Sequence, residues 1–230
     1  MIVLENSDEY LVQYHNEGNN KLMVLIHHTF EPGKHEFNLN KKDFYTKQIL
    51  LSNYDVIHIR SKQLENMYDA DITQTFNKII EITKQYKLVE GLFMCGGNVL
   101  GLYFSKYINY TNIYCQSPRF LKGFTVTENP EFDYTNYKVT EDHLNKDAYY
   151  YFINDDLDYY DFETKTWLSN KIKSHVHIQY HGIKRCHLLT EMFNLRELKD
   201  FLKCLFKKQK YHHDFLSYYI NYPNGTIHCV

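Results

Sequence analysis

The sequence predicts one α/β domain whose central sheet is mostly parallel and flanked by helices. A chain of 230 residues fits a single hydrophobic core, and a division into two domains would leave each part small. Strand-like apolar runs also alternate with segments whose apolar residues recur at helical spacing, and helical crossovers connect parallel strands. We expect residues 1–230 to form this single domain, with a loop or small cap in the polar stretch 125–145.

The first part of the chain is predicted to enter the sheet as a hairpin. Residues 9–15 and 21–26 have the pattern of strands, and the polar residues 16–20 between them are typical of a turn. A further strand is expected at 54–59. A helix should follow at 71–83, where isoleucines and a phenylalanine recur at helical spacing.

The strand-then-helix unit repeats along the rest of the chain. The expected elements are, in order, a strand at 88–94, a helix at 97–107, strands at 112–116 and 148–153, a helix at 163–172, a strand at 175–180 and a final helix at 188–207. The aromatic residues at 148–153 could bind sugars, but a buried strand is the favoured interpretation, because aromatic side chains suit pleated sheets.

Composition gives no indication of a nucleic acid or membrane partner. The formal net charge is -2 and the pI is about 6.7, so no general field attracts polyanions. No basic and apolar leader begins the chain and no apolar run is long enough to span a bilayer, so we expect a cytoplasmic protein. The five cysteines lack CxxC spacing, which argues against both a disulfide framework and a zinc ribbon.

A glycine-rich segment between a predicted strand and a predicted helix is the strongest indication of chemistry. Cys95 follows the strand, and Gly97 and Gly101 supply the small residues that a nucleophile elbow needs where its helix crosses the strand. A helix N-terminus there would favour a thiolate. Phe93 stands where the elbow pattern has glycine. Two alternatives remain: an inert, buried cysteine, or a register with Met94 at the turn and no nucleophile.

An acid and a histidine follow Cys95 in the chain order of an α/β-hydrolase triad. The acidic run after the strand at 148–153 offers Asp156 as the preferred acid, Asp158 as the close alternative and Asp155 as the third choice, unless the run is a solvated loop. His187 lies between the last predicted strand and the final helix. We therefore predict a Cys95, Asp156 and His187 triad.

The oxyanion of such a triad would be held by backbone N–H groups. We expect them from Gly96, directly after the nucleophile, and from His28 or Thr29, in the loop after the early buried strand. His175 and His177 have strand spacing and could ligate a metal, but a partly exposed strand face is favoured because no further ligand lies beside them. No metal site is predicted.

These segments together resemble the α/β-hydrolase-fold O-acetyltransferases of bacterial capsular polysaccharide synthesis and related surface-glycan proteins. The likeness rests on residues 21–32, on 51–55, on the elbow at 95–105 and on 112–118. That family has serine at the elbow, usually with glycine two residues before it, where this sequence has Cys95 and Phe93.

The resemblance implies an acyltransferase or esterase with no permanently bound cofactor. It implies acetyl-CoA as the acyl donor and a surface polysaccharide as the acceptor, although no residue of the sequence independently marks a CoA site. Cysteine paired with histidine is a competent acyl-transfer nucleophile. The alternative is an inactive glycan- or protein-binding module that retains the scaffold, which Phe93 and the Met94 register motivate.

Overall fold

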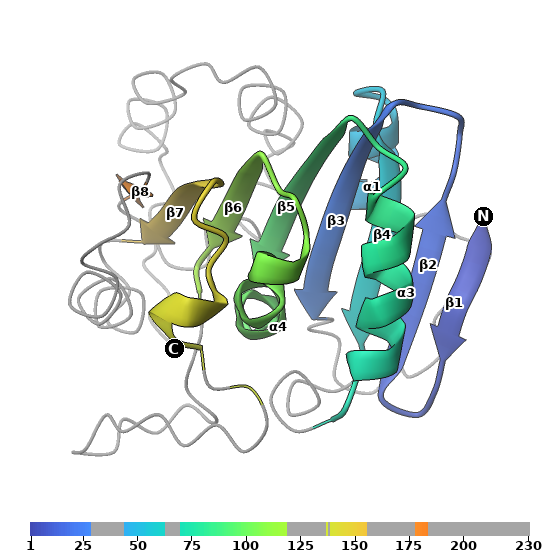
Figure 1. Cartoon of the computed structure of the whole chain (residues 1–230), viewed down its shortest axis with the longest axis horizontal. Helices are drawn as coiled ribbons and strands as arrows, with labels where there is room; N and C mark the ends of the chain where they lie inside the picture. The colour runs from blue at the N-terminus through green and yellow to red at the C-terminus, as the bar shows by residue number, and fades with distance from the viewer. Residues whose placement is uncertain (29–43, 63–69, 119–136, 138, 156–177, 184–230) are drawn as a thin grey trace, which may run out of the picture.

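The described part of the chain forms an eight-stranded sheet (Figure 1). The computed structural model describes residues 1–28, 44–62, 70–118, 137, 139–155 and 178–183. The strands are β1 (Ile2–Asn6), β2 (Tyr10–His15), β3 (Lys21–His28), β4 (Asp55–Ser61), β5 (Leu88–Met94), β6 (Asn112–Gln116), β7 (Tyr149–Asp155) and β8 (Ile178–Ile183). Their order across the sheet is β1-β2-β4-β3-β5-β6-β7-β8.

The sheet is mostly parallel, which confirms the prediction. From β4 through β3 and on to β8, every neighbouring pair is parallel, whereas β2 is antiparallel to both β1 and β4. The parallel strands therefore all end at one edge of the sheet. Polar groups that follow these strands are brought to that edge by the topology alone.

Helices cover both faces of the sheet (Figure 1). The two helices α3 (Thr73–Thr83) and α4 (Gly97–Tyr103) lie on one face, and α1 (Phe44–Leu50) lies behind the other. Short 3₁₀ turns follow at η1 (Ser105–Tyr107) and η2 (Glu141–His143). Burial on both faces explains why β3 and β5 are near-continuous apolar runs rather than alternating ones.

A buried apolar cluster lies between the sheet and the helices α3 and α4. Phe76 of α3 stacks on Phe104, which follows α4, with ring centroids 4.0 Å apart. Tyr137, from the stretch expected to be a loop or cap, is buried here too. Its hydroxyl donates to Ala70 O at 2.9 Å and accepts from Ile72 N at 3.0 Å, so it ties the start of α3 to a distant part of the chain.

The predicted hairpin of residues 9–15 and 21–26 is wrong. The strands β2 and β3 do run in opposite directions, but β4 lies between them. Asp55, at the start of β4, explains how the connection passes over that strand: its Oδ1 accepts the backbone N–H groups of Glu17 and Asn19 at 2.9 and 3.2 Å. Instead, β2 forms a hairpin with β1. Neither β1 nor α1 was predicted from the sequence.

Other differences lie at element ends. The helix expected at 97–107 ends at Tyr103 and continues as η1. The strand expected at 148–153 runs from Tyr149 to Asp155, and the strand expected at 175–180 is found at Ile178–Ile183. The helices expected at 163–172 and 188–207 lie outside the described residues.

Candidate active site

Cys95 lies at a tight turn between β5 and α4. Its φ of 50° is in the left-handed region, which is unusual for a residue other than glycine. Met94 is the last residue of β5, so Cys95 rather than Met94 occupies the turn. A left-handed non-glycine residue costs roughly 1–3 kcal/mol and persists only where its surroundings enforce it. The turn therefore combines a half-buried thiol with a strained backbone, as a nucleophile elbow does.

Two glycines of α4 allow the helix to cross the sheet at this turn. A Cβ atom on Gly97 would lie 2.7 Å from the carbonyl oxygen of Ile26 in β3. A Cβ atom on Gly101 would lie well within 3.0 Å of the ring carbons of Phe93. Neither position has room for a larger side chain unless the helix moves. The small residues that the elbow pattern requires are thus explained by two separate close approaches.

Phe93, which departs from the elbow pattern, is accommodated by a third glycine. Its ring is fully buried between β5 and α4 and packs edge-on against Tyr110, with centroids 5.8 Å apart. A Cβ atom on Gly91 would lie 2.6 Å from Phe93 Cζ. The ring therefore fills space left open by Gly91 and Gly101, and α4 can still approach the sheet. The elbow pattern singles out Phe93 as a departure, but it does not reveal the part that Gly91 takes.

Hydrogen bonds join the turn to the end of β6. The backbone N–H of Cys95 donates to Gln116 O at 3.0 Å. The side-chain amide of Asn98 donates to Cys95 O at 2.8 Å and to Gln116 O at 3.0 Å. Asn98 is fully buried in an otherwise apolar helix. That isolated polar residue was the sequence signal for this contact, and the sequence analysis missed it.

The two described cysteines have different environments. Both are present as thiols, but Cys95 is half-buried whereas Cys115 lies inside β6 with no exposure. Burial raises the pKa of the Cys115 thiol well above its usual value, because the charged thiolate would lose its hydration there. Cys115 therefore stays protonated at neutral pH. Cys186, Cys204 and Cys229 lie outside the described residues.

The other predicted site residues are placed only in part. Gly96 lies between Cys95 and α4, and His28 is the last residue of β3. Asp155 ends β7, two strands away from β5. Thr29, Asp156, Asp158 and His187 lie outside the described residues, as do His175 and His177. The backbone positions that are described belong to the same edge of the sheet, where the parallel strands end.

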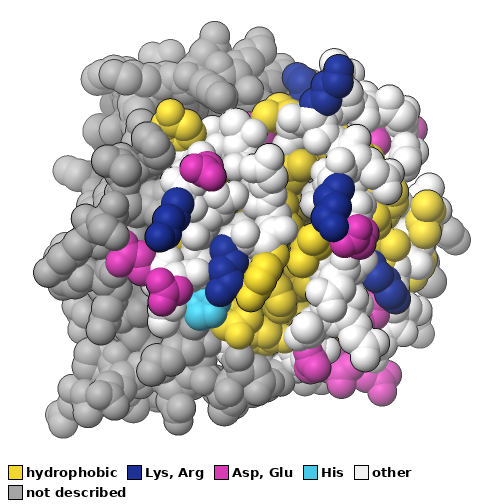
Figure 2. Space-filling view, in the orientation of Figure 1, with side chains coloured by type: hydrophobic (Ala, Val, Ile, Leu, Met, Phe, Trp, Pro, Cys, Tyr) yellow, Lys and Arg dark blue, Asp and Glu magenta, His cyan; other side chains and the backbone are white. Residues whose placement is uncertain are grey.

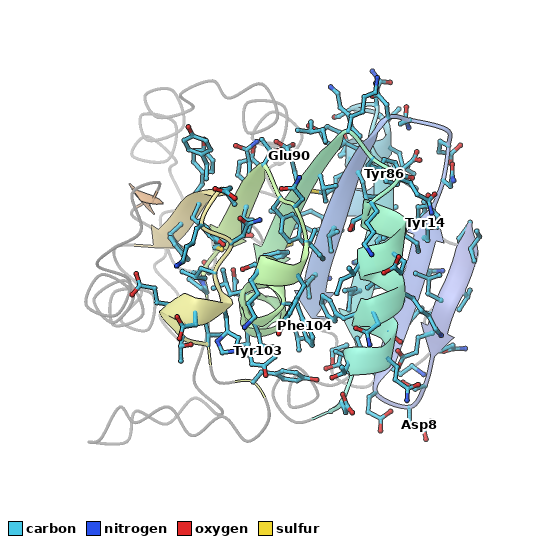
Figure 3. The ribbon with its side chains drawn as sticks, viewed as in Figure 1. Asp8, Tyr14, Tyr86, Glu90, Tyr103 and Phe104 are labelled. Atoms are coloured by element: carbon cyan, nitrogen blue, oxygen red, sulfur yellow. The ribbon has the colours of Figure 1, made fainter. Side chains whose placement is uncertain are left out.

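A second polar cluster lies at the opposite end of the sheet (Figure 3). The buried carboxylate of Glu90 accepts hydrogen bonds from the Tyr54 hydroxyl, at 2.6 Å, and from the Asn112 amide. Burial, followed by the contact with Glu90, raises the pKa of Tyr54. Cys95 lies five positions after Glu90 in the sequence, about 16 Å away at the usual rise per strand residue. Glu90 is therefore too distant to take part in chemistry at Cys95.

Among the described residues, the face that carries α3 and α4 shows no large field of one charge sign. Figure 2 shows basic and acidic side chains interspersed there around a hydrophobic area near α4. Within the described ranges, no three histidine, cysteine, aspartate or glutamate side chains are placed to hold a metal ion. None of the described helices combines the length and the apolar character that a membrane crossing requires.

Solved structures share this architecture. The capsule O-acetyltransferase of Neisseria meningitidis serogroup A is 18% identical over 86% of this chain and 92% of its own, with a TM-score of 0.56. A mutant of that enzyme in complex with CoA has the same TM-score at 16% identity, covering 87% of this chain and 92% of its own. An esterase of Pyrococcus furiosus has a TM-score of 0.54 at 14% identity, covering 87% of both chains.

No protein-family model and no curated protein matches the sequence. At such identities the structural likeness concerns the fold alone. It confirms the fold class predicted from the sequence. The chain has the α/β-hydrolase fold.

Proposed function

We propose that this protein is an acyltransferase or esterase in which Cys95 is the nucleophile. The observation that carries the proposal is the left-handed backbone of Cys95 at the β5–α4 turn, because this geometry presents a side chain at the edge where the parallel strands end. The fold is consistent with the proposal, since the structural neighbours include esterases and a capsule O-acetyltransferase.

The proposed reaction proceeds through an acylated cysteine. His187 removes the proton of the Cys95 thiol, and Asp156 accepts a hydrogen bond from the imidazole and orients it. The sulfur attacks the acyl carbonyl, whose oxygen becomes an oxyanion held by the N–H of Gly96 and a second N–H near His28 or Thr29. The C–O or C–S bond of the donor then breaks, and His187 returns the proton to the leaving group.

The second half repeats these roles with an acceptor. His187 deprotonates a sugar hydroxyl or a water molecule, which attacks the thioester carbonyl. The tetrahedral intermediate collapses, the bond to Cys95 Sγ breaks, and the imidazolium returns the proton to the sulfur. The product is an O-acylated acceptor or a free acid, and the enzyme is restored.

The topology supports the choice of the acid and the histidine. Asp155 ends β7 at the same edge of the sheet as Cys95, and Asp156 follows it in the sequence. The strand β7 extends two residues beyond the end that the sequence pattern indicated, and Asp158 remains the alternative acid. The parallel strand β8 ends at Ile183, four residues before His187. The three candidate triad residues thus follow strands that end at the same edge of the sheet, within the run from β5 to β8.

We propose acetyl-CoA as the donor and a hydroxyl of a bacterial surface polysaccharide as the acceptor. The support is the structural likeness to the capsule O-acetyltransferase, a mutant of which was solved in complex with CoA. Both would be substrates rather than permanently bound groups. A cytoplasmic location fits the proposal, because acetyl-CoA is an intracellular thioester.

Intact-mass spectrometry after incubation with acetyl-CoA or p-nitrophenyl acetate tests the proposal. We expect the mass of one acetyl group to be added to the protein and lost from it when an acceptor is supplied. Cys95→Ala should abolish the adduct. Cys115→Ala is the matched control and should keep it, because Cys115 is buried and protonated. The absence of any adduct on the folded protein would favour a binding module that only retains the scaffold.

A further inference from the structure

Asn98 carries the one side-chain amide of α4. The other residues of this helix are glycines, apolar residues and a tyrosine. It is fully buried beneath the turn at Cys95. Its Nδ2 donates to two carbonyl oxygens from different elements, Cys95 O at 2.8 Å and Gln116 O at 3.0 Å. Its backbone N–H also donates to Cys95 O, at 3.1 Å. The carbonyl of Cys95 therefore receives two hydrogen bonds from the same residue.

The orientation of the Asn98 amide follows from these neighbours. Both atoms within reach of Nδ2 are carbonyl oxygens, which accept hydrogen bonds only, so the NH₂ group must face them. Asn98 Oδ1 is buried and has no partner among the described residues. An unmet buried acceptor is unfavourable, and an apolar residue at this position would avoid it. Asparagine therefore contributes at this position through the two hydrogen bonds that its NH₂ group donates.

The bonds to Cys95 O act on the peptide that joins Cys95 to Gly96. In a trans peptide the C=O and the N–H are held in one plane and point in opposite directions. Two donors that fix Cys95 O on one side therefore also fix the direction of the Gly96 N–H on the other side. Hydrogen bonds to a carbonyl polarise its peptide and strengthen the N–H as a donor.

The bond to Gln116 O fixes this peptide relative to the sheet. Gln116 O accepts both Cys95 N and Asn98 Nδ2, each at 3.0 Å, so the turn and the helix share one anchor on β6. The next residue, Ser117, donates its own N–H to Ile153 O of β7 at 2.8 Å. The end of β6 is thereby held by β7. The hydrogen bonds to Gln116 O in turn hold Cys95 in its left-handed conformation.

We propose that Asn98 is a positioning residue for the oxyanion hole. It aims and polarises the Gly96 N–H through the Cys95 carbonyl, and it holds that peptide at a fixed place on β6. The inference rests on the proposed function, because an oxyanion forms only if Cys95 is acylated. In this role Asn98 acts through the peptide between Cys95 and Gly96 rather than directly on the acyl group.

Two reactions of Cys95 separate this role from general support of the turn. Acylation by p-nitrophenyl acetate passes through a tetrahedral oxyanion, whereas alkylation by iodoacetamide displaces iodide at a saturated carbon and forms none. Asn98→Leu keeps the approximate volume and the backbone N–H but removes the amide donor. We expect the single-turnover rate of acylation to fall on the order of tenfold to a hundredfold. This loss is no larger than the one caused by removing an oxyanion donor itself. Alkylation should stay within about threefold, since it needs only the thiolate.

Asn112→Leu is the matched control. Asn112 is equally buried and also lies on a core element, but its amide donates to Glu90 at the other end of the sheet. It should lower thermal stability without changing the ratio of acylation to alkylation. If Asn98→Leu does not fold, Asn98→Ser provides the same comparison, because its short side chain cannot reach both carbonyls.

The outcomes are distinct. Wild-type protein that is alkylated but never acylated would remove the proposed function and this inference together. Wild-type protein that is acylated, with Asn98→Leu acylated equally fast, would overturn this inference alone. Equal losses in acylation and alkylation would also overturn it, since they would mean that Asn98 only supports the turn. A selective loss of acylation, absent in Asn112→Leu, is the expected result.

Discussion

Phe93 occupies a position where a bulky side chain would ordinarily keep a helix away from the sheet. Here Gly91 beneath the ring and Gly101 above it leave the space that the ring fills, so the residue is a part of the packed core rather than an obstacle. The three positions form one steric unit. A departure from a sequence pattern at one residue is thus compensated at two others.

This packing predicts the effect of Phe93→Ala. Removal of a fully buried ring leaves a cavity between two rigid elements, so the free energy of unfolding should fall by about 3–5 kcal/mol. Urea denaturation measures this as a lower midpoint at an unchanged m-value. Tyr149→Ala is the control. Tyr149 is 44% exposed, so its substitution should lower the free energy of unfolding far less. A loss below about 1 kcal/mol for Phe93→Ala would contradict the packing described here.

Cys95→Ser asks whether the site is adapted to sulfur. A serine hydroxyl is not ionised at neutral pH and needs closely aligned base catalysis, whereas a cysteine reacts as a thiolate with looser geometry. We expect the rate of acyl transfer in the serine variant to fall on the order of tenfold or more, about 1.4 kcal/mol of transition-state stabilisation. Steady-state kinetics with an activated ester would measure it. An equal or faster rate would show that the site is adapted to serine.

At the level of elements, the approach of α4 to β3 and β5 determines where the turn lies. Gly97 contacts the backbone of β3, which cannot yield, and Gly101 contacts the ring of Phe93, which can be replaced. A larger side chain at Gly101 could therefore be accommodated by replacing Phe93, whereas one at Gly97 could not be accommodated in this way. This difference allows the helix position to be tested by a second substitution.

Gly101→Ala should destabilise the protein by about 1–3 kcal/mol, as overpacking of a filled core does. Phe93→Leu in the same chain should recover part of that loss, because the smaller side chain makes room for the new methyl group. A double-mutant cycle of unfolding free energies would then give a coupling energy of about 0.5 kcal/mol or more. Additive effects would mean that the ring and the helix do not share one close contact.

The sequence predicted those elements whose signals are local. The periodicity of 71–83 and the apolar run of 88–94 are properties of single segments, and both elements were found with nearly the expected bounds. The pairing of β2 was not predictable in this way. Turn residues at 16–20 predict a reversal of direction, but they do not reveal that β4, from a later part of the chain, lies between the two strands.

In the candidate site, too, local features could be predicted from the sequence and contacts between distant segments could not. Cys95 could be identified because the strand, the turn and the glycines are adjacent in sequence, and the structure gives it the left-handed backbone of an elbow. Asn98 is marked in the sequence only as an isolated polar residue in an apolar helix, and its contact with Gln116, 18 residues away, could not be predicted from that segment. Contacts between strands carry that information, and no single segment contains it.

At the level of the whole molecule, the parallel sheet is what could assemble a triad. Residues 95, 155 and 183 are far apart in the chain, yet each lies at or beside the carboxyl end of a strand in the run from β5 to β8. The chain leaves the sheet at the same edge each time. An acid after β7 and a histidine after β8 therefore need only short segments to approach the turn at Cys95.

The choice of acid and base can be tested on this basis. His187→Ala should abolish acyl transfer while the protein stays folded, because a residue beyond the end of β8 is expected to act in chemistry rather than in packing. Asp156→Asn should lower kcat less severely, because a thiolate and imidazolium pair depends less on a third group than an alkoxide does. Asp158→Asn is the matched variant and should have the smaller effect of the two.

Stopped-flow acylation with an activated ester, together with circular dichroism of each variant, would measure these effects. A larger loss in Asp158→Asn than in Asp156→Asn would assign the acid to Asp158, two residues further along the chain. A well-folded His187→Ala protein with unchanged acylation would remove His187 from the mechanism. The order of losses His187, then Asp156, then Asp158 is expected because the base moves the proton in both half-reactions, whereas the acid only orients the base.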